Sequence, residues 1–152
     1  MATSNPQSTA QIAGHPLHPM LIPFPVAFLV STFACDLAVW RTGNTAWSTA
    51  SLYLLGAALI MAALAALAGL TDFMGDRRIR DLSAAWHHML GNVVVVLLSL
   101  WNWYRRYADG DAAVVPTGLF ISLIVVLILL YTGWRGWEMV YMHRVAVRDH
   151  TA

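Results

Sequence analysis

Four of the six histidines in this 152-residue sequence fall into two close pairs, and their imidazoles are the side chains best suited to chemistry. His15 and His18 lie in the stretch GHPLHP at residues 14–19, and His87 and His88 are adjacent. A neutral imidazole binds haem iron or a transition-metal ion, and it titrates near physiological pH. The two pairs therefore point to cofactor binding, with proton relay or pH sensing as a further use of the same groups.

A b-type haem needs two axial imidazoles at similar depth on opposing elements. His18 and His88 meet this requirement because each stands near the start of an apolar run, with His15 and His87 as substitutes. Asn92, one helical turn after His88, is the further candidate at this cofactor site. We therefore expect these residues to hold a haem b that is used for electron transfer.

A single transition-metal ion is the alternative cofactor. His15, His18, Asp72 and His88 would supply a mixed shell of imidazoles and a carboxylate for Fe, Zn, Cu or Ni, with Asn92 as an acceptor behind His88. The sequence has no HExxH, CxxC or EF-hand spacing, so it does not select among these metals. A structural or scaffolding membrane subunit without a cofactor stays open as the third interpretation.

No catalytic motif accompanies the histidines. The sequence shows no Ser-His-Asp spacing, no phosphate-binding loop and no paired catalytic carboxylates. Cys35, the only cysteine, falls in an apolar run, where a thiol stays protonated and packs as a small hydrophobe. We therefore name no catalytic residue, and redox electron transfer is favoured over hydrolase or transferase activity.

The composition places these residues in a membrane protein. The sequence is 59% hydrophobic and only 11% charged, whereas soluble domains are about 25% charged. This balance excludes a disordered chain and an ordinary cytosolic enzyme, and the net charge of +1 gives no reason to expect nucleic acid as a partner. Four apolar runs, each close to the roughly 20 residues that cross a bilayer, cover residues 20–40, 51–70, 87–103 and 114–134.

These runs predict an all-α integral membrane protein with a bundle of four transmembrane helices, because helices satisfy every backbone group in lipid. The predicted division is a polar tail over residues 1–14, the transmembrane domain over residues 15–142 and a second polar tail over residues 143–152. Prolines have no amide donor and disfavour helical conformation in the preceding residue. They predict an extended entry segment up to Pro25, with prolines at Pro16, Pro19, Pro23 and Pro25.

Arginines are unevenly distributed between the two sides of this predicted bundle. The side with both termini and the second loop has six, and the opposite side has three: Arg41, Arg105 and Arg106. The excess predicts cytoplasmic termini. All six histidines, including His143 and His150, then fall on the cytoplasmic face. The expected partners are the lipid bilayer and a redox protein but no nucleic acid, and a homo-oligomer is left open.

Asp36 is the formally charged residue that falls inside an apolar run. It follows His18 by 18 residues, which is about 27 Å along a helix, so the two side chains cannot bind the same ion. A charge at that depth needs a partner. We expect a structural ion pair with Arg41, Arg105 or Arg106.

Several of these features together resemble a bacterial inner-membrane family called domain of unknown function 2231. The similarity covers roughly residues 14–140, and its residues are the double His-Pro element with Pro23 and Pro25, Asp36, Gly69-Leu70-Thr71-Asp72, and His88 with Asn92. The resemblance implies four transmembrane helices and no established activity. Some related sequences are associated with Rieske-type iron–sulfur domains, which points to electron transfer, although this chain has no cysteine pair.

Overall fold

A computed structural model describes residues 5–147 of the chain. Four long helices account for most of it: α2 (Pro23–Thr42), α3 (Ala46–Gly75), α5 (Ser83–Asp109) and α6 (Leu119–Tyr141). The shorter elements are β1 (Gln11–Ile12), β2 (His15–Pro16), α1 (Leu17–Leu21), α4 (Arg77–Arg80), a 3₁₀ turn η1 (Gly110–Ala113) and a wide turn η2 (Val114–Gly118). The two short strands pair antiparallel as a small hairpin.

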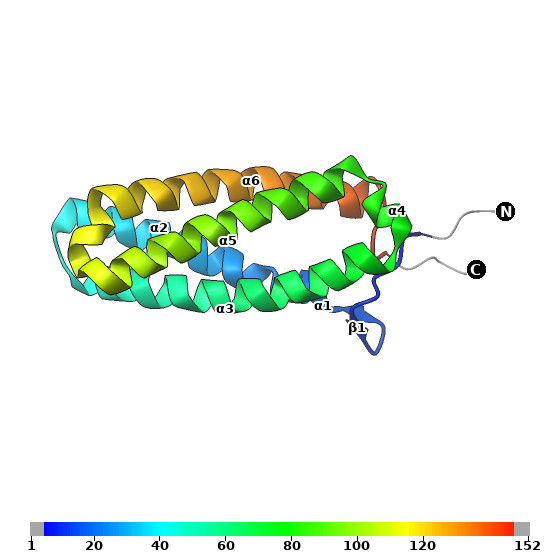
Figure 1. Cartoon of the computed structure of the whole chain (residues 1–152), viewed down its shortest axis with the longest axis horizontal. Coiled ribbons are helices and arrows are strands. Elements are labelled where there is room, and N and C mark those ends of the chain that lie inside the picture. The colour runs from blue at the N-terminus through cyan, green and yellow to red at the C-terminus, as the bar shows by residue number, and fades with distance from the viewer. Residues whose placement is uncertain (1–4, 148–152) are drawn as a thin grey trace.

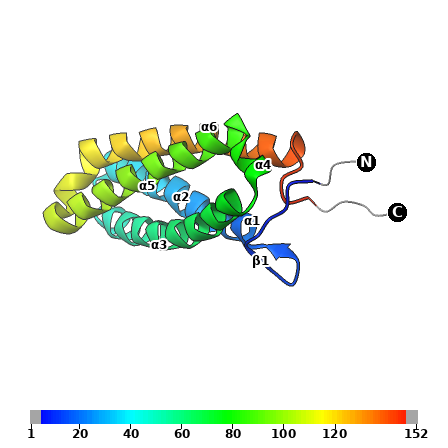
Figure 2. The same ribbon diagram turned by 45° about the vertical axis from the view of Figure 1, so that its right-hand side comes forward.

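The four long helices run side by side along the long axis of the molecule (Figure 1). The closest pairs are α2 with α3 and α5 with α6, and contacts of α2 with α6 and of α3 with α5 close the ring. Figure 2 shows the same bundle from a second direction, with α1, α4 and the hairpin gathered at one end. We call this the hairpin end; the η1 and η2 turns form the opposite end.

The predicted all-α membrane fold is confirmed. Within residues 5–147, three helical stretches are long and apolar enough to cross a membrane, namely Leu17–Thr42, Ala46–Gly75 and Ser83–Tyr141. The third stretch contains both α5 and α6, since η1 and η2 reverse the chain between them. The bundle thus has four long helices, and α3 and α5 extend beyond the runs expected for them.

The proline-rich entry was expected to be extended up to Pro25, and this expectation is wrong. Only Pro16 keeps an extended conformation, since α1 begins at Leu17 and α2 at Pro23. Pro19, Pro23 and Pro25 each lie among the first three residues of a helix. A proline costs no hydrogen bond there because the first N–H groups of a helix have no acceptor within it.

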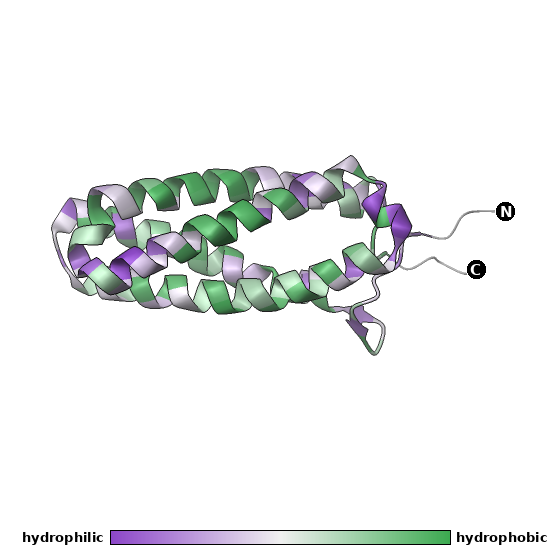
Figure 3. Cartoon of the chain, in the orientation of Figure 1, coloured by the Kyte–Doolittle hydropathy of each residue, from purple (hydrophilic) through white to green (hydrophobic). Residues whose placement is uncertain are grey.

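The outer surface of the bundle is apolar. Large hydrophobic side chains remain exposed along every long helix, among them Val30, Ile60, Leu97 and Leu130. Figure 3 shows hydrophobic residues along the middle of the helices and hydrophilic residues gathered toward the ends, most clearly at α4. An exposed apolar surface of this extent is stable in contact with lipid.

Two apolar clusters hold the bundle together. The central one contains Leu29, Leu55, Ala58, Val95 and Val125, which lie on α2, α3, α5 and α6. The second lies at the hairpin end, where the chain after α6 packs back against α3, α4 and α5; its buried members are Phe73, Ile79, Ala85 and Val145. The second cluster fixes how the helices approach each other at the hairpin end, to which the histidine-bearing segments belong.

Candidate functional site

His18 and His88 lie together at the hairpin end of the bundle. Their ring centroids are 6.0 Å apart and their ring planes are inclined by 85°. His18 belongs to α1 and His88 to the second turn of α5, so the two rings come from segments about 70 residues apart. We call these two residues the paired histidines.

A main-chain carbonyl of a neighbouring helix fixes each ring. Nδ1 of His18 lies 2.7 Å from the carbonyl oxygen of Ala65 on α3, and Nδ1 of His88 lies 2.8 Å from that of Thr132 on α6. A carbonyl only accepts hydrogen bonds, so both Nδ1 atoms donate. In a neutral imidazole the lone pair is then on Nε2, and neither Nε2 has a hydrogen-bond partner within residues 5–147.

Two glycines allow these close approaches. A Cβ atom at Gly69 of α3 would lie 2.7 Å from Cε1 and 2.8 Å from Nδ1 of His18. At Gly136 of α6 it would lie 3.1 Å from Cε1 and Nδ1 of His88. Both glycines are helical and have ordinary backbone conformations, so the requirement comes from the space that the rings occupy.

Asn92 supports the main chain around His88. Its Nδ2 donates to the carbonyl oxygen of His88 at 2.7 Å, and the hydroxyl of Thr132 donates to its Oδ1 at 3.4 Å. Gly91 packs against the same threonine, since a Cβ atom there would collide with Cγ2 of Thr132. Asn92 thus links the main chain of His88 to Thr132, the residue whose carbonyl fixes the His88 ring.

His15 and His87 lie outside the pair. His15 is exposed on β2, with Nδ1 3.1 Å from the carbonyl oxygen of Ala13. His87 is exposed on α5, where its Nδ1 lies 3.3 Å from the hydroxyl of Ser83. His143 is exposed near Glu138, and His150 lies outside the described residues. The side chains of the two substitutes thus have partners of their own.

Asp72 binds the N-terminal segment. Its Oδ1 accepts hydrogen bonds from the Ser8 hydroxyl and from the backbone N–H groups of Thr9 and Ala10, at 2.7–2.8 Å. Within residues 5–147, no three His, Cys, Asp or Glu side chains form a group that could hold a metal ion. The predicted four-residue shell of His15, His18, Asp72 and His88 is therefore not assembled, because the carboxylate and one imidazole are engaged elsewhere.

Asp76, which lies outside the membrane-spanning helices, also binds the N-terminal segment through its carboxylate. Its Oδ1 accepts from the backbone N–H of Arg78, which caps α4, and its Oδ2 accepts from the Arg78 guanidinium at 2.7 Å and from the N–H of Gln7 at 3.2 Å. Hydrogen bonding from the Arg78 side chain, more than any other cause, lowers the pKa of Asp76 from 3.8 to about 2.

We expect Asp76→Ala to lower the free energy of unfolding by about 1 kcal/mol at neutral pH, the usual loss for a helix cap. The folded-state pKa lies below the unfolded value, so this contribution is present above about pH 4 and is lost as the pH falls toward 2. Thermal unfolding of wild type and variant in detergent at both pH values measures it. A difference that persists unchanged at pH 2 would contradict the assignment.

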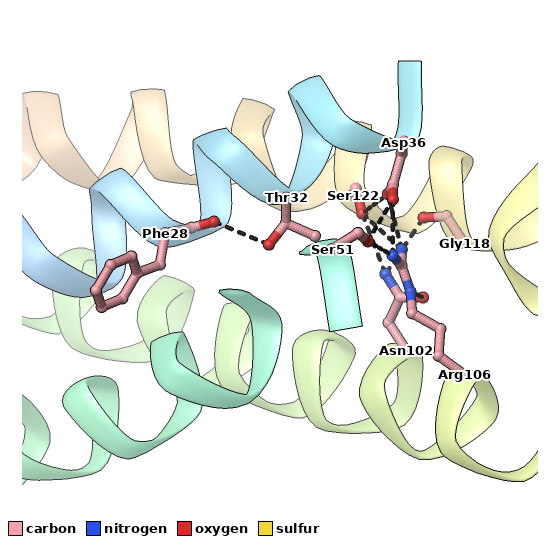
Figure 4. A network of polar contacts seen from close by, with 8 residues as sticks. All are labelled: Phe28, Thr32, Asp36, Ser51, Asn102, Arg106, Gly118 and Ser122. Atoms are coloured by element: carbon pink, nitrogen blue, oxygen red, sulfur yellow. Dashed lines mark hydrogen bonds and ion pairs between the residues drawn. The ribbon is translucent and has the colours of Figure 1, made fainter. Parts of the chain in front are cut away.

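A second polar cluster lies at the opposite end of the bundle (Figure 4). Asp36 on α2 and Arg106 on α5 form a two-pronged ion pair, with Nη1–Oδ1 and Nη2–Oδ2 distances of 2.7 Å. Their side chains are 0% and 1% exposed. Of the three arginines expected as partners of Asp36, the structure selects Arg106. Arg105 instead pairs with Asp109, and Arg41 lies over the ring of Trp40.

The hydrogen bonds of this ion pair are almost completely satisfied. The hydroxyls of Ser51 on α3 and Ser122 on α6 each donate to Asp36 at 2.7 Å. Arg106 donates from Nε to Oδ1 of Asn102 at 3.1 Å, and also to the Ser51 hydroxyl. Side chains from all four long helices therefore meet in one cluster, which we call the four-helix polar cluster.

Sequence reasoning did not identify Gly69 and Gly136 as ring contacts or Thr132 as the residue that accepts from His88. The hydroxyl of Ser122, within the apolar run 114–134, was a signal for the four-helix polar cluster. Thr132 accepts from His88 through its main-chain carbonyl, so its side chain gave no sign of that contact. Ala65 contributes only its main-chain carbonyl, and the residue type gives no indication of such a contact.

The bundle of apolar helices with buried polar sites at its two ends defines an integral membrane protein. A comparison with family models agrees, since the model described as predicted membrane protein (DUF2231) matches residues 14–149. The chain therefore belongs to the DUF2231 family, and the resemblance noted in the sequence is confirmed. No curated protein and no solved structure matched the chain.

Proposed function

We propose that this membrane protein binds one haem b between His18 and His88 and uses it to pass electrons to or from a partner protein. The observation that carries the proposal is the pairing of two imidazoles from different helices, each with Nδ1 tied to a main-chain carbonyl. A hydrogen bond at Nδ1 is what fixes the tautomer and the ring orientation of a histidine that binds a metal through Nε2.

The rings are close enough for both imidazoles to hold one metal. Metal–imidazole bonds are about 2.0–2.1 Å long. The paired histidines have a centroid distance of 6.0 Å. The two helices that would flank the macrocycle, α3 and α5, diverge toward the hairpin end (Figure 1).

Two histidine ligands also favour one kind of chemistry. His18 and His88 would together hold the iron, and a haem held by two histidines would supply one-electron transfer, so we favour that use over binding of a substrate or dioxygen. The protein's own groups would tune such a cofactor in two ways. The carbonyls of Ala65 and Thr132 would increase the electron density on the two imidazole rings. The surrounding apolar helices would lower the local dielectric constant.

The proposal is tested by absorbance of the full-length protein purified in detergent from cells supplied with haem. Wild type should show a Soret band that shifts on reduction with dithionite, and His18→Ala and His88→Ala should each lose it. His15→Ala and His87→Ala are matched controls, since each changes a neighbouring exposed histidine, and both should keep the band.

A colourless wild-type protein would contradict the haem proposal. Elemental analysis of that protein would then separate the two alternatives: one equivalent of Fe, Zn, Cu or Ni that is lost in His18→Ala indicates a non-haem metal site. Neither haem nor metal indicates a structural or scaffolding subunit, in which the two imidazoles simply tie α1 to α3 and α5 to α6.

The orientation of the protein belongs to the same proposal. The side with the hairpin end holds Arg77, Arg78, Arg80, Arg135 and Arg144 among its arginines, and the other side holds three. Such an excess marks the cytoplasmic side of a bacterial inner membrane. The paired histidines would then face the cytoplasm, where a redox partner could approach them.

A further inference from the structure

A small pocket lies beside the four-helix polar cluster, at the end of the bundle formed by η1 and η2. Its volume is about 60 Å³. The residues around it include Ser48 from the first turn of α3, Arg106 from the last turn of α5, Asp111 from η1 and Val114 from η2. We call it the turn pocket. Because Arg106 forms part of its wall, the turn pocket reaches the buried ion pair with Asp36.

Ser48 contributes an unpaired hydroxyl to the wall of the turn pocket. The residue is 4% exposed, and its Oγ has no hydrogen-bond partner among residues 5–147. A buried hydroxyl that has left water without gaining a partner destabilises the folded protein, and native proteins pair nearly all such groups with protein or with ordered water. Arg106 has no need of this hydroxyl, since all three of its nitrogens already donate within the four-helix polar cluster. The unpaired hydroxyl therefore points to a guest molecule in the pocket.

The charges around the turn pocket favour a neutral guest. Asp111 is exposed, and in the described part of the chain its carboxylate forms no hydrogen bond or ion pair, so it would repel an anion at close range. Arg106 and the positive end of the α3 helix dipole would repel a cation, since Ser48 is the third residue of that helix. A neutral molecule that can both donate and accept hydrogen bonds suits the carboxylate and the hydroxyl together.

The size of the turn pocket restricts this neutral guest to water. A buried water molecule needs about 10–15 Å³, so a pocket of about 60 Å³ has room for about four. Each water needs two to four polar partners. The hydroxyl of Ser48 and the carboxylate of Asp111 supply such partners to the first molecules, which then bind the others.

Ser99 on α5 provides an internal comparison. It is 2% exposed, and its Oγ likewise has no hydrogen-bond partner within residues 5–147. The side chains around it are apolar, among them Leu29, Ala58 and Val95, and the space beside it is only about 10 Å³. A site without further polar partners does not hold water. We therefore expect the hydroxyl of Ser99 to be dry and that of Ser48 to be hydrated.

We propose that the turn pocket holds a cluster of about four ordered water molecules, bound by Ser48 and Asp111. This water brings the aqueous phase to the four-helix polar cluster from one face of the membrane only. Toward the hairpin end, the central apolar cluster, which includes Leu55 and Val125, separates the ion pair from the paired histidines. The bundle would thus be wet at the turn pocket and dry in its middle.

Nuclear magnetic resonance of the full-length protein tests this proposal directly. The protein is labelled with ¹⁵N-serine and dissolved in phosphocholine micelles whose acyl chains are deuterated. The backbone N–H of Ser48 should show a cross peak to water, with the sign that marks bound rather than diffusing water. The backbone N–H of Ser99 should show none. Both residues are observed in one wild-type sample, so each spectrum contains its own control.

Stability gives a second readout of the same difference. Ser48→Ala removes a hydrogen-bond partner of the water, whereas Ser99→Ala removes a hydroxyl that has no partner. Both changes substitute alanine for serine in a helix, so the gain in helix propensity is similar. The midpoint of thermal unfolding in detergent should therefore be about 2–4 °C lower for Ser48→Ala than for Ser99→Ala.

Each other outcome overturns the proposal. A Ser48 N–H without a cross peak would show that the turn pocket is dry. A cross peak to the headgroup protons of the detergent would assign the pocket to a lipid headgroup instead of water. Equal unfolding midpoints of the two variants would show that the hydroxyl of Ser48 binds no water. Because the resonance experiment uses wild-type protein, a poorly folded variant leaves the test decisive.

Discussion

Replacing Asp36 with asparagine is expected to lower the free energy of unfolding by about 3–5 kcal/mol, because the change leaves a buried guanidinium without its counter-charge. Arg106 is 3% exposed and has both terminal nitrogens on the carboxylate of Asp36. Asparagine has nearly the same volume as aspartate, so the loss reports charge and hydrogen bonding rather than a cavity. Unfolding of the detergent-solubilised protein by SDS measures it.

Two further variants test whether the loss of stability comes from the burial of this ion pair. Asp109→Asn removes the carboxylate of an exposed ion pair, in which Asp109 lies 2.6 Å from Nε of Arg105, and should cost at most about 1 kcal/mol. The double variant Asp36→Leu/Arg106→Met removes both charges at once and should recover much of the lost stability. If Asp36→Asn lowered the free energy of unfolding no more than Asp109→Asn does, the buried ion pair would not stabilise the bundle as its geometry indicates.

Substituting alanine for Gly69 is expected to displace the His18 ring and break its bond to the carbonyl of Ala65. The added Cβ would lie 2.7 Å from a ring carbon, and atoms inserted into a packed site cost about 1–3 kcal/mol. Gly136→Ala should have a smaller effect, since its Cβ would lie 3.1 Å from the His88 ring. Thermal unfolding ranks the stabilities, and the amplitude of the Soret band reports the loss of the proposed haem.

Gly133→Ala is the matched control for this series. It lies on α6, three residues before Gly136, and a Cβ atom there would meet nothing within 4 Å. Alanine favours a helix by about 1 kcal/mol over glycine, so this variant should be neutral or slightly more stable. Equal effects of all three substitutions would show that helix propensity, and not the space around the rings, decides the outcome.

The sequence was sufficient to predict the class of fold, and it named His18 and His88, whose rings lie 6.0 Å apart in the structure; their use as cofactor ligands stays a prediction. Apolar runs of membrane-spanning length are set by the bilayer and appear directly in the residue order. His18 and His88 could be chosen because both stand near the start of such runs. The 59% hydrophobic content decided the class before any contact was known.

What the sequence could not provide depends on contacts between segments. The acceptors of both Nδ1 atoms are main-chain carbonyls, and a carbonyl is present at every position. The choice of Arg106 over Arg105 depends on which side of α5 faces the interior of the bundle, where Asp36 lies. Asp72 was named as a metal ligand on residue type, while its neighbours in space, Ser8 to Ala10, lie more than 60 residues away.

The prediction of an extended entry segment from its prolines was wrong for a different reason. Their lack of an amide donor is fixed, but whether this prevents a helix depends on where the helix starts. At Pro19, Pro23 and Pro25 the chain is in a first helical turn, where no donor is required. Periodicity cannot locate such a start within a continuous apolar run.

The two polar sites share a spacing along three segments of the chain. On α3 and α5, 18 residues separate a member of the four-helix polar cluster from a residue at the paired histidines: Ser51 from Gly69, and Arg106 from His88. The same separation runs from Gly118 of η2, whose carbonyl oxygen accepts a hydrogen bond from Asn102, to Gly136 on α6. Eighteen residues make about five turns of 3.6 residues, which brings both ends of each segment to the same face, about 27 Å apart.

Because of this spacing, the number of residues between the two polar sites fixes the rotation of one site relative to the other about the helix axis. Inserting one residue anywhere between them on α5 would rotate His88 by about 100° relative to Arg106, so only one of the two sites could then face the interior. Insertions are expected to be tolerated in the turn between α2 and α3 and in η1, and rejected in the segments between the sites. The length of these helices is thus set by angular phase as well as by the thickness of the bilayer.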